Sequence, residues 1–297
     1  MKNTLPAFFI LFAAICWGTT GTTQALAPDT AHPIAVGATR LAVGGSFLLI
    51  MVLLTGKLDL KNWPIKTTLV ASICMALYQP FFFSAVTLTG VAIGTVVAIG
   101  SAPILSGAIE WIFLKKRPTQ IWWYSTSLSI LGCLLLFITK GSVQADPFGV
   151  LMAIGAGLTF ACYTVVSRSL VERYSSLSVV AIVFILSAIF LAPLLFIFDM
   201  SWILSVSGVT TSLHLGIVAT GVAYLLFAKG LAKVSSSTAV TLALAEPLTA
   251  AFLGVFFLGE KLTSTSWLGV ILLLCGIGIL IMKPQKSQSS KQVEEVL

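Results

Sequence analysis

Few side chains in this sequence could carry chemistry, and four ionisable ones stand out because they lie inside long apolar runs: Arg40, Glu110, His214 and Glu246. A charged group surrounded by hydrocarbon is costly, so each should face a partner or water. Arg40 always keeps its charge and must meet a carboxylate, carbonyl groups or water. A structural role and recognition of a substrate carboxylate are both open for it. Glu110 is expected to pair near Lys115 or to reach the membrane surface, and His214 to pack.

Glu246 differs from the others because it lies in the middle of its apolar run, with Pro247 directly after it. The charged form of a carboxyl is disfavoured there. Two roles remain open: a neutral Glu246 could exchange a proton during a functional cycle, and an ionised one could pair with Arg40 or a substrate amine. Because proline removes a backbone hydrogen bond, Pro247 and Pro103 predict hinges at bent or broken helices in mid-membrane.

Uncharged polar and aromatic side chains form the second group of candidates. Polar groups in apolar helices should point at a partner or a water-filled cavity, although Ser and Thr also bond to their own helix backbone. With Arg40 and Glu246, the candidate substrate-binding residues are Trp17, Thr20, Gln24, Tyr78, Gln79, Ser101, Tyr163 and Tyr224. They predict an aromatic cavity with few charges, suited to a zwitterionic or neutral metabolite with an apolar side chain. Trp17 and Tyr163 are expected to face each other across it.

The chain that must position these residues is almost entirely apolar: 58% of its 297 residues are hydrophobic, 9% are charged and the mean hydropathy is +1.04. Soluble proteins carry about 25% charged residues, so a soluble enzyme, a nucleic-acid-binding domain and a disordered chain are excluded. Since a span needs roughly 20 apolar residues, we predict an all-α membrane protein with ten transmembrane helices. Their expected ranges are 5–27, 33–55, 66–88, 91–114, 120–139, 147–170, 176–198, 209–231, 235–258 and 264–282.

The polar candidates lie in the first, third, fourth, sixth, eighth and ninth of these spans, which are therefore expected to line the cavity. The tenth span is almost purely aliphatic and glycine. It should face lipid or a second copy of the chain, so the protein is expected to be a monomer or a homodimer.

Lysine and arginine are distributed very unequally between the two sides that ten spans define. With the N-terminus inside, fourteen fall on the cytoplasmic side and only Lys140 and Lys261 outside. Positive residues favour the cytoplasm, so both termini are expected there, in a bacterial-type plasma (inner) membrane, and the net charge of +7 requires no nucleic acid. Residues 284–297 should form a disordered cytoplasmic tail. The first span should be retained rather than cleaved as a signal, because Pro28 follows the small-residue run 25–27.

A shift of 144 residues superposes the fourth and fifth predicted spans on the ninth and tenth. Identical residues then coincide at Pro103 and Pro247, Thr119 and Thr263, Trp123 and Trp267, and Gly132 and Gly276. The chain is therefore expected to consist of two five-helix halves, residues 1–141 and 142–283. Because five is odd, the second half must cross the membrane in the opposite sense. Such inverted repeats are common in secondary transporters with a site near the bilayer midplane.

Several of these residues resemble a known family. Trp17-Gly18, Arg40, Glu246-Pro247 and the run from Phe257 to Leu262 look like the EamA family of the drug/metabolite transporter superfamily, over residues 5–282. The first half departs from that pattern, with Leu114-Lys115-Lys116 where the family often repeats Leu-Gly-Glu. The resemblance implies a transporter, commonly an exporter, of amino acids or related small metabolites.

Other chemistry finds little support in the sequence. Two histidines and five cysteines without a CxxC pair argue against a metal site or disulfides, and no GxSxG or GxxxxGK[ST] sequence indicates catalytic residues or ATP-driven pumping. No cofactor is expected, and gradients should supply the energy, with proton coupling as one candidate. The leading hypothesis is a secondary transporter that exports amino acids or related zwitterions by alternating access around a midplane cavity. Exporters of purines, nucleosides or drugs, and a membrane-embedded enzyme, are the alternatives.

Overall fold

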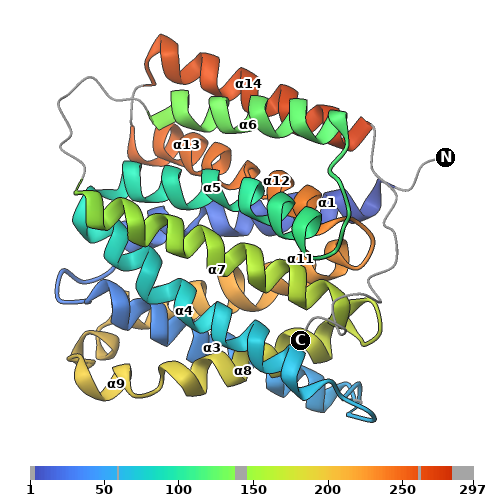
Figure 1. Ribbon diagram of the computed structural model, residues 1–297. Coiled ribbons are helices and arrows are strands. Elements are labelled where there is room, and N and C mark those ends of the chain that lie inside the picture. The colour runs from blue at the N-terminus through green and yellow to red at the C-terminus, as the bar shows by residue number, and fades with distance from the viewer. Residues whose placement is uncertain (1–3, 59, 138–145, 260–261, 283–297) are drawn as a thin grey trace.

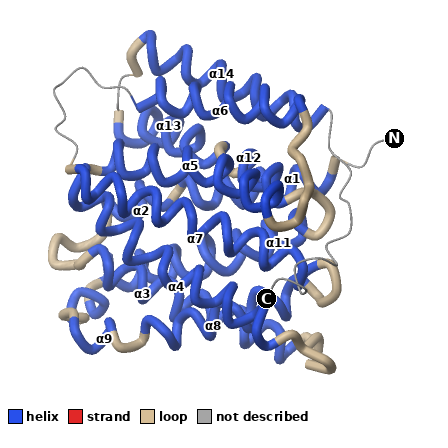
Figure 2. The backbone as a smooth tube through the Cα atoms, viewed as in Figure 1, coloured by secondary structure: helices blue, strands red, loops and turns tan. Residues whose placement is uncertain are grey.

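The computed structural model describes residues 4–58, 60–137, 146–259 and 262–282, and within these ranges the chain is built from helices without a strand. Ten helical segments are long and apolar enough to cross a membrane, close to the ranges expected from the sequence. They lie side by side in a bundle, with their connections at its two ends (Figure 1, Figure 2). The predicted class, an all-α membrane protein with ten spans, is confirmed. The predicted junction near residue 141 and the tail from 284 lie outside the described residues.

Six spans are continuous helices: α3 (Pro33–Leu54), α4 (Ile65–Thr89), α5 (Val91–Ile112), α6 (Gln120–Phe137), α7 (Pro147–Val171) and α14 (Ser264–Met282). Four are interrupted. The first consists of α1 (Leu5–Gly18) and α2 (Thr20–Ala25), and the seventh of α8 (Ser176–Leu191) and α9 (Leu194–Ile197). The eighth follows a 3-10 helix (Ser201–Leu204) and contains α10 (Val206–Leu213), a π-helix η2 (His214–Val222) and α11 (Ala223–Leu231). The ninth contains α12 (Ser236–Leu242) and α13 (Ala245–Leu258).

Polar residues at the ends of the apolar runs start several of these helices. The side chains of Asp146, Ser175, Ser205 and Ser235 each accept a hydrogen bond from a backbone amide two or three residues further on. Such N-caps satisfy amides that the first helical turn leaves without a carbonyl partner. Gly259, with φ of +69°, ends α13 in the left-handed conformation that glycine adopts most easily.

The two mid-span prolines behave differently. The ninth span breaks between Leu242 and Ala245, directly before Pro247. In contrast, α5 continues through Pro103, so a break at that position is wrong. Helices in a membrane protein tolerate proline where neighbouring groups satisfy the freed backbone carbonyl. The hinge role of both prolines stays a prediction.

Helices α6 and α14 lie side by side at one edge of the bundle, green and red in Figure 1. Their backbones approach closely because glycines stand at the crossing: a Cβ on Gly269 would lie 2.6 Å from the carbonyl oxygen of Gly132. About two helical turns from this crossing, the Ser125 hydroxyl of α6 donates to the carbonyl of Gly276 in α14. Small residues of this kind let membrane helices pack without a gap. The other face of α14 exposes large apolar side chains, as expected for a face toward lipid: Trp267, Leu268, Ile271 and Leu274.

Four connections lie together at one end of the bundle, on the right in Figure 1: residues 55–58 with 60–64, 113–119, 172–175 and 232–235. They carry many of the basic residues, including Lys57, Lys61, Lys116 and Lys233, and we call this end the basic end. The Tyr174 hydroxyl donates to the carbonyl of Asn62 at 2.6 Å and ties two of these connections together.

The sidedness of the basic end can be tested by labelling. In a cysteine-free background, we expect Lys61→Cys to react with an impermeant maleimide only in inverted vesicles, and Asp29→Cys only in intact cells. Both residues are exposed, in connections at opposite ends of the bundle. Positive residues are retained on the cytoplasmic side, which is the physical reason for the expected pattern. Labelling of both positions from the same side would contradict the ten-span topology.

Candidate substrate-binding cavity

A cavity of about 150 Å³ lies in the half of the bundle away from the basic end. Its position follows from lining residues near the far ends of their helices: Gln24 of α2, Val86 of α4 and Phe137 of α6. A cavity of about 150 Å³ engineered into another protein holds a benzene molecule. The volume therefore suits a small metabolite better than a drug-sized molecule.

Most of the predicted binding residues meet at this cavity. Seven of them line it: Trp17, Thr20, Gln24, Arg40, Tyr78, Tyr224 and Glu246. The six spans expected to line the cavity all contribute, and the second and fifth spans add one residue each, Arg40 and Phe137. Pro247 also lines it, whereas Pro103 does not border it within the described residues.

Three candidates lie behind the cavity wall. Gln79 follows Tyr78 on α4, so it points about 100° away around the helix, against Gly37, and is 1% exposed. The Ser101 hydroxyl donates to the Ala98 carbonyl at 3.1 Å and packs against a neighbouring glycine. Tyr163 is 2% exposed. They do not border this cavity, because polarity does not reveal which way a side chain points on a helix that is apolar all round. Their role in substrate binding stays a prediction.

A cluster of rings replaces the expected contact between Trp17 and Tyr163. The Trp17 ring lies 4.8 Å from that of Tyr224, and Tyr224 lies 5.9 Å from Tyr163, so Tyr224 stands between them. Phe160 also contacts Trp17, at 6.0 Å, and Tyr78, at 5.8 Å. The indole N–H of Trp17 is buried without a hydrogen-bond partner in the described part of the chain. It is a donor that a bound molecule could use.

Arg40 is buried, and its guanidinium is held by uncharged groups of the π-helix η2. Its Nε donates to the Thr220 hydroxyl at 3.1 Å, and its Nη2 donates to the Ala219 carbonyl at 3.2 Å. Short π-helical segments are frequent at functional sites. Within the described ranges, the ion pairs join Arg168 to Glu110 and to Glu172, and Arg40 takes part in none. Its positive charge is therefore available to an anionic group in the cavity.

Glu246 reaches the same cavity from the first turn of α13. The start of a helix favours a negative charge because its backbone amides point toward it. Glu246 forms no ion pair with Arg40 in the described structure. The cavity is thus lined by one guanidinium and one carboxyl group, set in a wall of aromatic rings.

The interruption of the first span lies beside this cavity and contacts both the eighth and the ninth span. Gly18, the last residue of α1, packs so closely on α13 that a Cβ there would lie 2.5 Å from Cβ of Thr249. Thr19, in the break after it, has its hydroxyl 2.8 Å from Nε2 of His214. His214 was expected only to pack, and this hydrogen bond links the break to the start of η2.

Cysteine labelling can separate the cavity wall from the layer behind it. In a cysteine-free background, Thr20→Cys should react rapidly with a water-soluble thiol reagent, because a thiolate forms only where water reaches it. Ser101→Cys and Ile271→Cys should react at least tenfold more slowly, since the first lies between helices and the second on the exposed apolar face of α14. Equal rates at all three positions would contradict the placement of the cavity.

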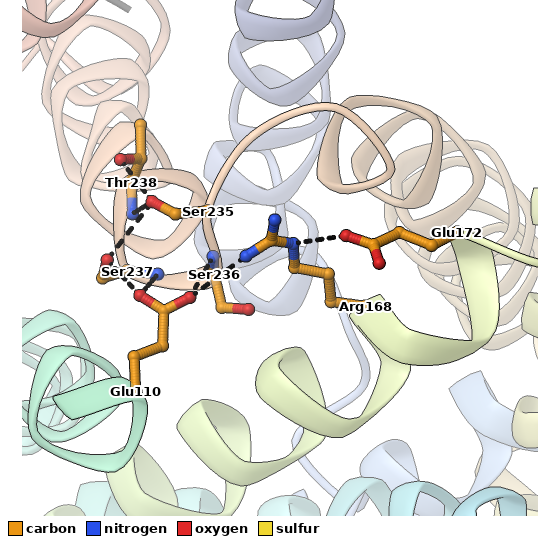
Figure 3. A network of polar contacts seen from close by, with 7 residues as sticks. All are labelled: Glu110, Arg168, Glu172, Ser235, Ser236, Ser237 and Thr238. Carbon is orange, nitrogen blue, oxygen red and sulfur yellow. Dashed lines mark hydrogen bonds and ion pairs between the residues drawn. The ribbon is translucent and has the colours of Figure 1, made fainter. Parts of the chain in front are cut away.

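The ion pair expected for Glu110, with Lys115, is not the one that the structure shows. The Glu110 carboxylate does not pair with Lys115 but lies 3.3 Å from Nη1 of Arg168, deep between helices at the basic end (Figure 3). Arg168 escaped the sequence analysis because it stands near the end of its span and was counted as a cytoplasmic charge. The serine run 235–237 was a signal that could have been used, since serines before an apolar run predict a capped helix start.

Comparison with known proteins agrees with these features. One relative, the uncharacterized transporter YwfM of Bacillus subtilis (strain 168), is 51% identical over 98% of both chains. A more distant one, the threonine/homoserine exporter RhtA of Salmonella typhimurium (strain SL1344), is 27% identical over 67% of this chain and 68% of its own. A solved crystal structure shares the fold, with a TM-score of 0.82 at 19% identity, covering 93% of this chain and 96% of that one.

A family description also matches the chain twice, over residues 4–138 and again over residues 147–282. Together these two segments include nearly the whole of the ten-span bundle and every residue that lines the cavity. The chain belongs to the EamA-like transporter family.

Proposed function

We propose that this transporter exports small amino acids or closely related zwitterions across the plasma membrane. The observation that carries the proposal is the cavity itself, which places Arg40 and Glu246 in one space lined by Trp17, Tyr78 and Tyr224. A substrate carboxylate fits the guanidinium, which makes bidentate hydrogen bonds. A substrate amine fits the carboxyl, and an apolar side chain fits the rings. The name of the distant relative RhtA supports amino acids as the substrate class.

The proposed mechanism is alternating access between two five-helix halves, residues 1–141 and 142–283. The two family matches, one in each half, support this division. In the proposed cycle, Glu246 binds either the substrate ammonium group or a proton, because a lone carboxylate in a closed membrane cavity is unfavourable. Exchange of one for the other would couple export to a proton gradient without a cofactor.

Transport by the purified protein is the direct test of this function. Protein reconstituted in liposomes should exchange labelled L-threonine or L-leucine with unlabelled amino acid in counterflow, with no added enzyme or partner. The same amino acids should raise the thermal stability of the detergent-solubilised protein, since a ligand stabilises the folded state that binds it. Adenosine and guanosine serve as controls and should do neither. Stabilisation by nucleosides with no response to amino acids would contradict the proposed substrate.

A further inference from the structure

The most extensive buried polar cluster in the described structure lies outside the cavity, where α5, α7 and α12 meet (Figure 3). Oε1 of Glu110 accepts from the Ser236 amide at 2.8 Å and faces Nη1 of Arg168 at 3.3 Å. Oε2 accepts from both the amide and the hydroxyl of Ser237. Glu110 and Arg168 are only 3% and 2% exposed. We call Glu110, Arg168, Ser236 and Ser237 the latch.

The latch lies between the cavity and the basic end, on helices that also form the cavity wall. Ala102 of α5, Phe160 of α7 and Val240 of α12 line the cavity. Glu110 and Arg168 follow the first two by eight residues, which is about 12 Å along a helix. Ser236 precedes Val240 by four residues, about 6 Å in the same direction.

Apolar side chains complete the closure next to the latch. Leu114 and Val165 are each 4% exposed and pack together with Ile109. One turn along α12 from Ser237, the hydroxyls of Thr126 and Thr241 lie 2.9 Å apart and join α6 to α12. Buried side chains of α5, α7 and α12 therefore lie between the cavity and the basic end.

The chemistry of the latch suits a contact that forms and breaks. A buried ion pair is seldom more stable than apolar side chains of the same volume, because both charges lose their hydration. An apolar closure, however, is unfavourable to open, since opening exposes its whole surface to water. The charges and backbone amides of the latch form hydrogen bonds with each other when the latch is closed and with water when it is open. Opening a latch of this composition therefore costs less free energy than opening an apolar closure of the same size would.

We propose that the latch closes the cavity at the basic end and separates when the cavity opens to that side. This inference rests on the proposed alternating-access function. Helix α12 connects the two sites directly, because its first turn holds Glu110 and its other end joins α13 at the break before Glu246. Movement of Glu246 on substrate binding therefore reaches the latch through one short helix.

A cysteine reporter beside the latch tests the proposal. In a cysteine-free protein in detergent, where reagent reaches both ends, Val165→Cys should react very slowly with a cationic methanethiosulfonate. Adding Glu110→Gln should raise that rate about tenfold or more, because the amide does not balance the charge of Arg168 and its nitrogen cannot accept hydrogen bonds as the second carboxylate oxygen does. Thr20→Cys in the cavity should become slower to react in the same variant, as the cavity closes on its own side.

Glu172→Gln is the matched control. Glu172 also pairs with Arg168, at 3.2 Å, but from the same segment four residues on, so this ion pair does not join two helices. It should leave the Val165→Cys rate within about twofold of the parent. An unchanged rate in folded Glu110→Gln would overturn the proposal, as would an equal increase in Glu172→Gln.

Two further measurements make the outcome decisive. If Glu110→Gln does not fold, Ser237→Ala removes one hydroxyl donor and keeps the ion pair: a rate increase of about threefold supports the latch, and no increase overturns it. Amino-acid counterflow, measured on the same preparations, distinguishes failure of the latch proposal from failure of the proposed substrate.

A faster Val165→Cys reaction in Glu110→Gln, together with no counterflow in the parent protein, supports the latch and contradicts the proposed substrate. Counterflow in the parent with an unchanged reporter rate contradicts the latch alone.

Discussion

Replacing Arg40 by Gln is expected to weaken the binding of L-leucine by roughly a hundredfold. The guanidinium is buried and held only by uncharged groups, so a substrate carboxylate would be its first anionic partner. Removing one partner of a desolvated charge pair raises the binding free energy by about 2–5 kcal/mol, and about 2.7 kcal/mol corresponds to a hundredfold. Isothermal titration calorimetry of the detergent-solubilised protein measures this change.

Substrate analogues make the result specific to a charge. L-leucinol lacks the carboxylate, so its weaker binding should be the same in Arg40→Gln as in the parent protein. Glu246→Gln should show the opposite selectivity: it should weaken leucine and leucinol, which both carry the amine, and spare 4-methylpentanoate, which does not. Each variant is the control for the other, because both residues line the same cavity. Equal losses for all three ligands in either variant would indicate a general change in the cavity instead of recognition of one charge.

The second large effect is expected at the glycine crossing between α6 and α14. In Gly269→Ala, the new methyl group would lie 2.6 Å from both the carbonyl oxygen of Gly132 and the amide nitrogen of Leu136. Both atoms belong to the backbone, so neither can turn aside as a side chain would. Overpacking of this kind destabilises proteins by about 1–3 kcal/mol, and we expect Tm to fall by about 5 °C.

The same helix offers the matched control for this prediction. Gly278 of α14 has no atom within 4 Å of the place where a Cβ would stand. Gly278→Ala should therefore leave Tm unchanged or raise it slightly, since alanine favours a helix by about 1 kcal/mol relative to glycine. Thermal unfolding of the three purified proteins in one detergent makes the comparison. A fall of similar size in both variants would show that the close backbone approach is not the cause.

The number and placement of the spans could be predicted because hydropathy alone decides them. The direction of side chains on those spans could not, because lipid and protein interior are both apolar and the helices carry no clear polar stripe. Gln79 and Ser101 were assigned to the cavity for their polarity alone, yet both lie between helices. Phe83 and Phe160 line the cavity but were indistinguishable from most of the other phenylalanines, of which the chain has 19.

Contacts between distant segments account for the remaining differences. The partners of Glu110 stand 58 and 126 residues further along the chain, at Arg168 and Ser236. The spacing within one span could only suggest its near neighbour Lys115. The partner of Arg40 could not be predicted either. Its hydrogen bond to Thr220 depends on a π-helix, and no pattern in residues 214–222 predicts one. The sequence thus identifies Arg40, Glu110 and Glu246 as candidates but does not reveal the groups that hold them, Arg168 among them.

The π-helix η2 has a consequence for the register of the eighth span. A π-helical turn holds about one residue more than an α-helical turn of the same height. If the residues from His214 to Val222 were wound as a regular α-helix instead, α11 would be rotated by about 100° relative to α10. Tyr224 would then turn out of the cavity, and Arg40 would lose its arrangement with Ala219 and Thr220. One extra residue in this span therefore sets the orientation of two parts of the binding site at once.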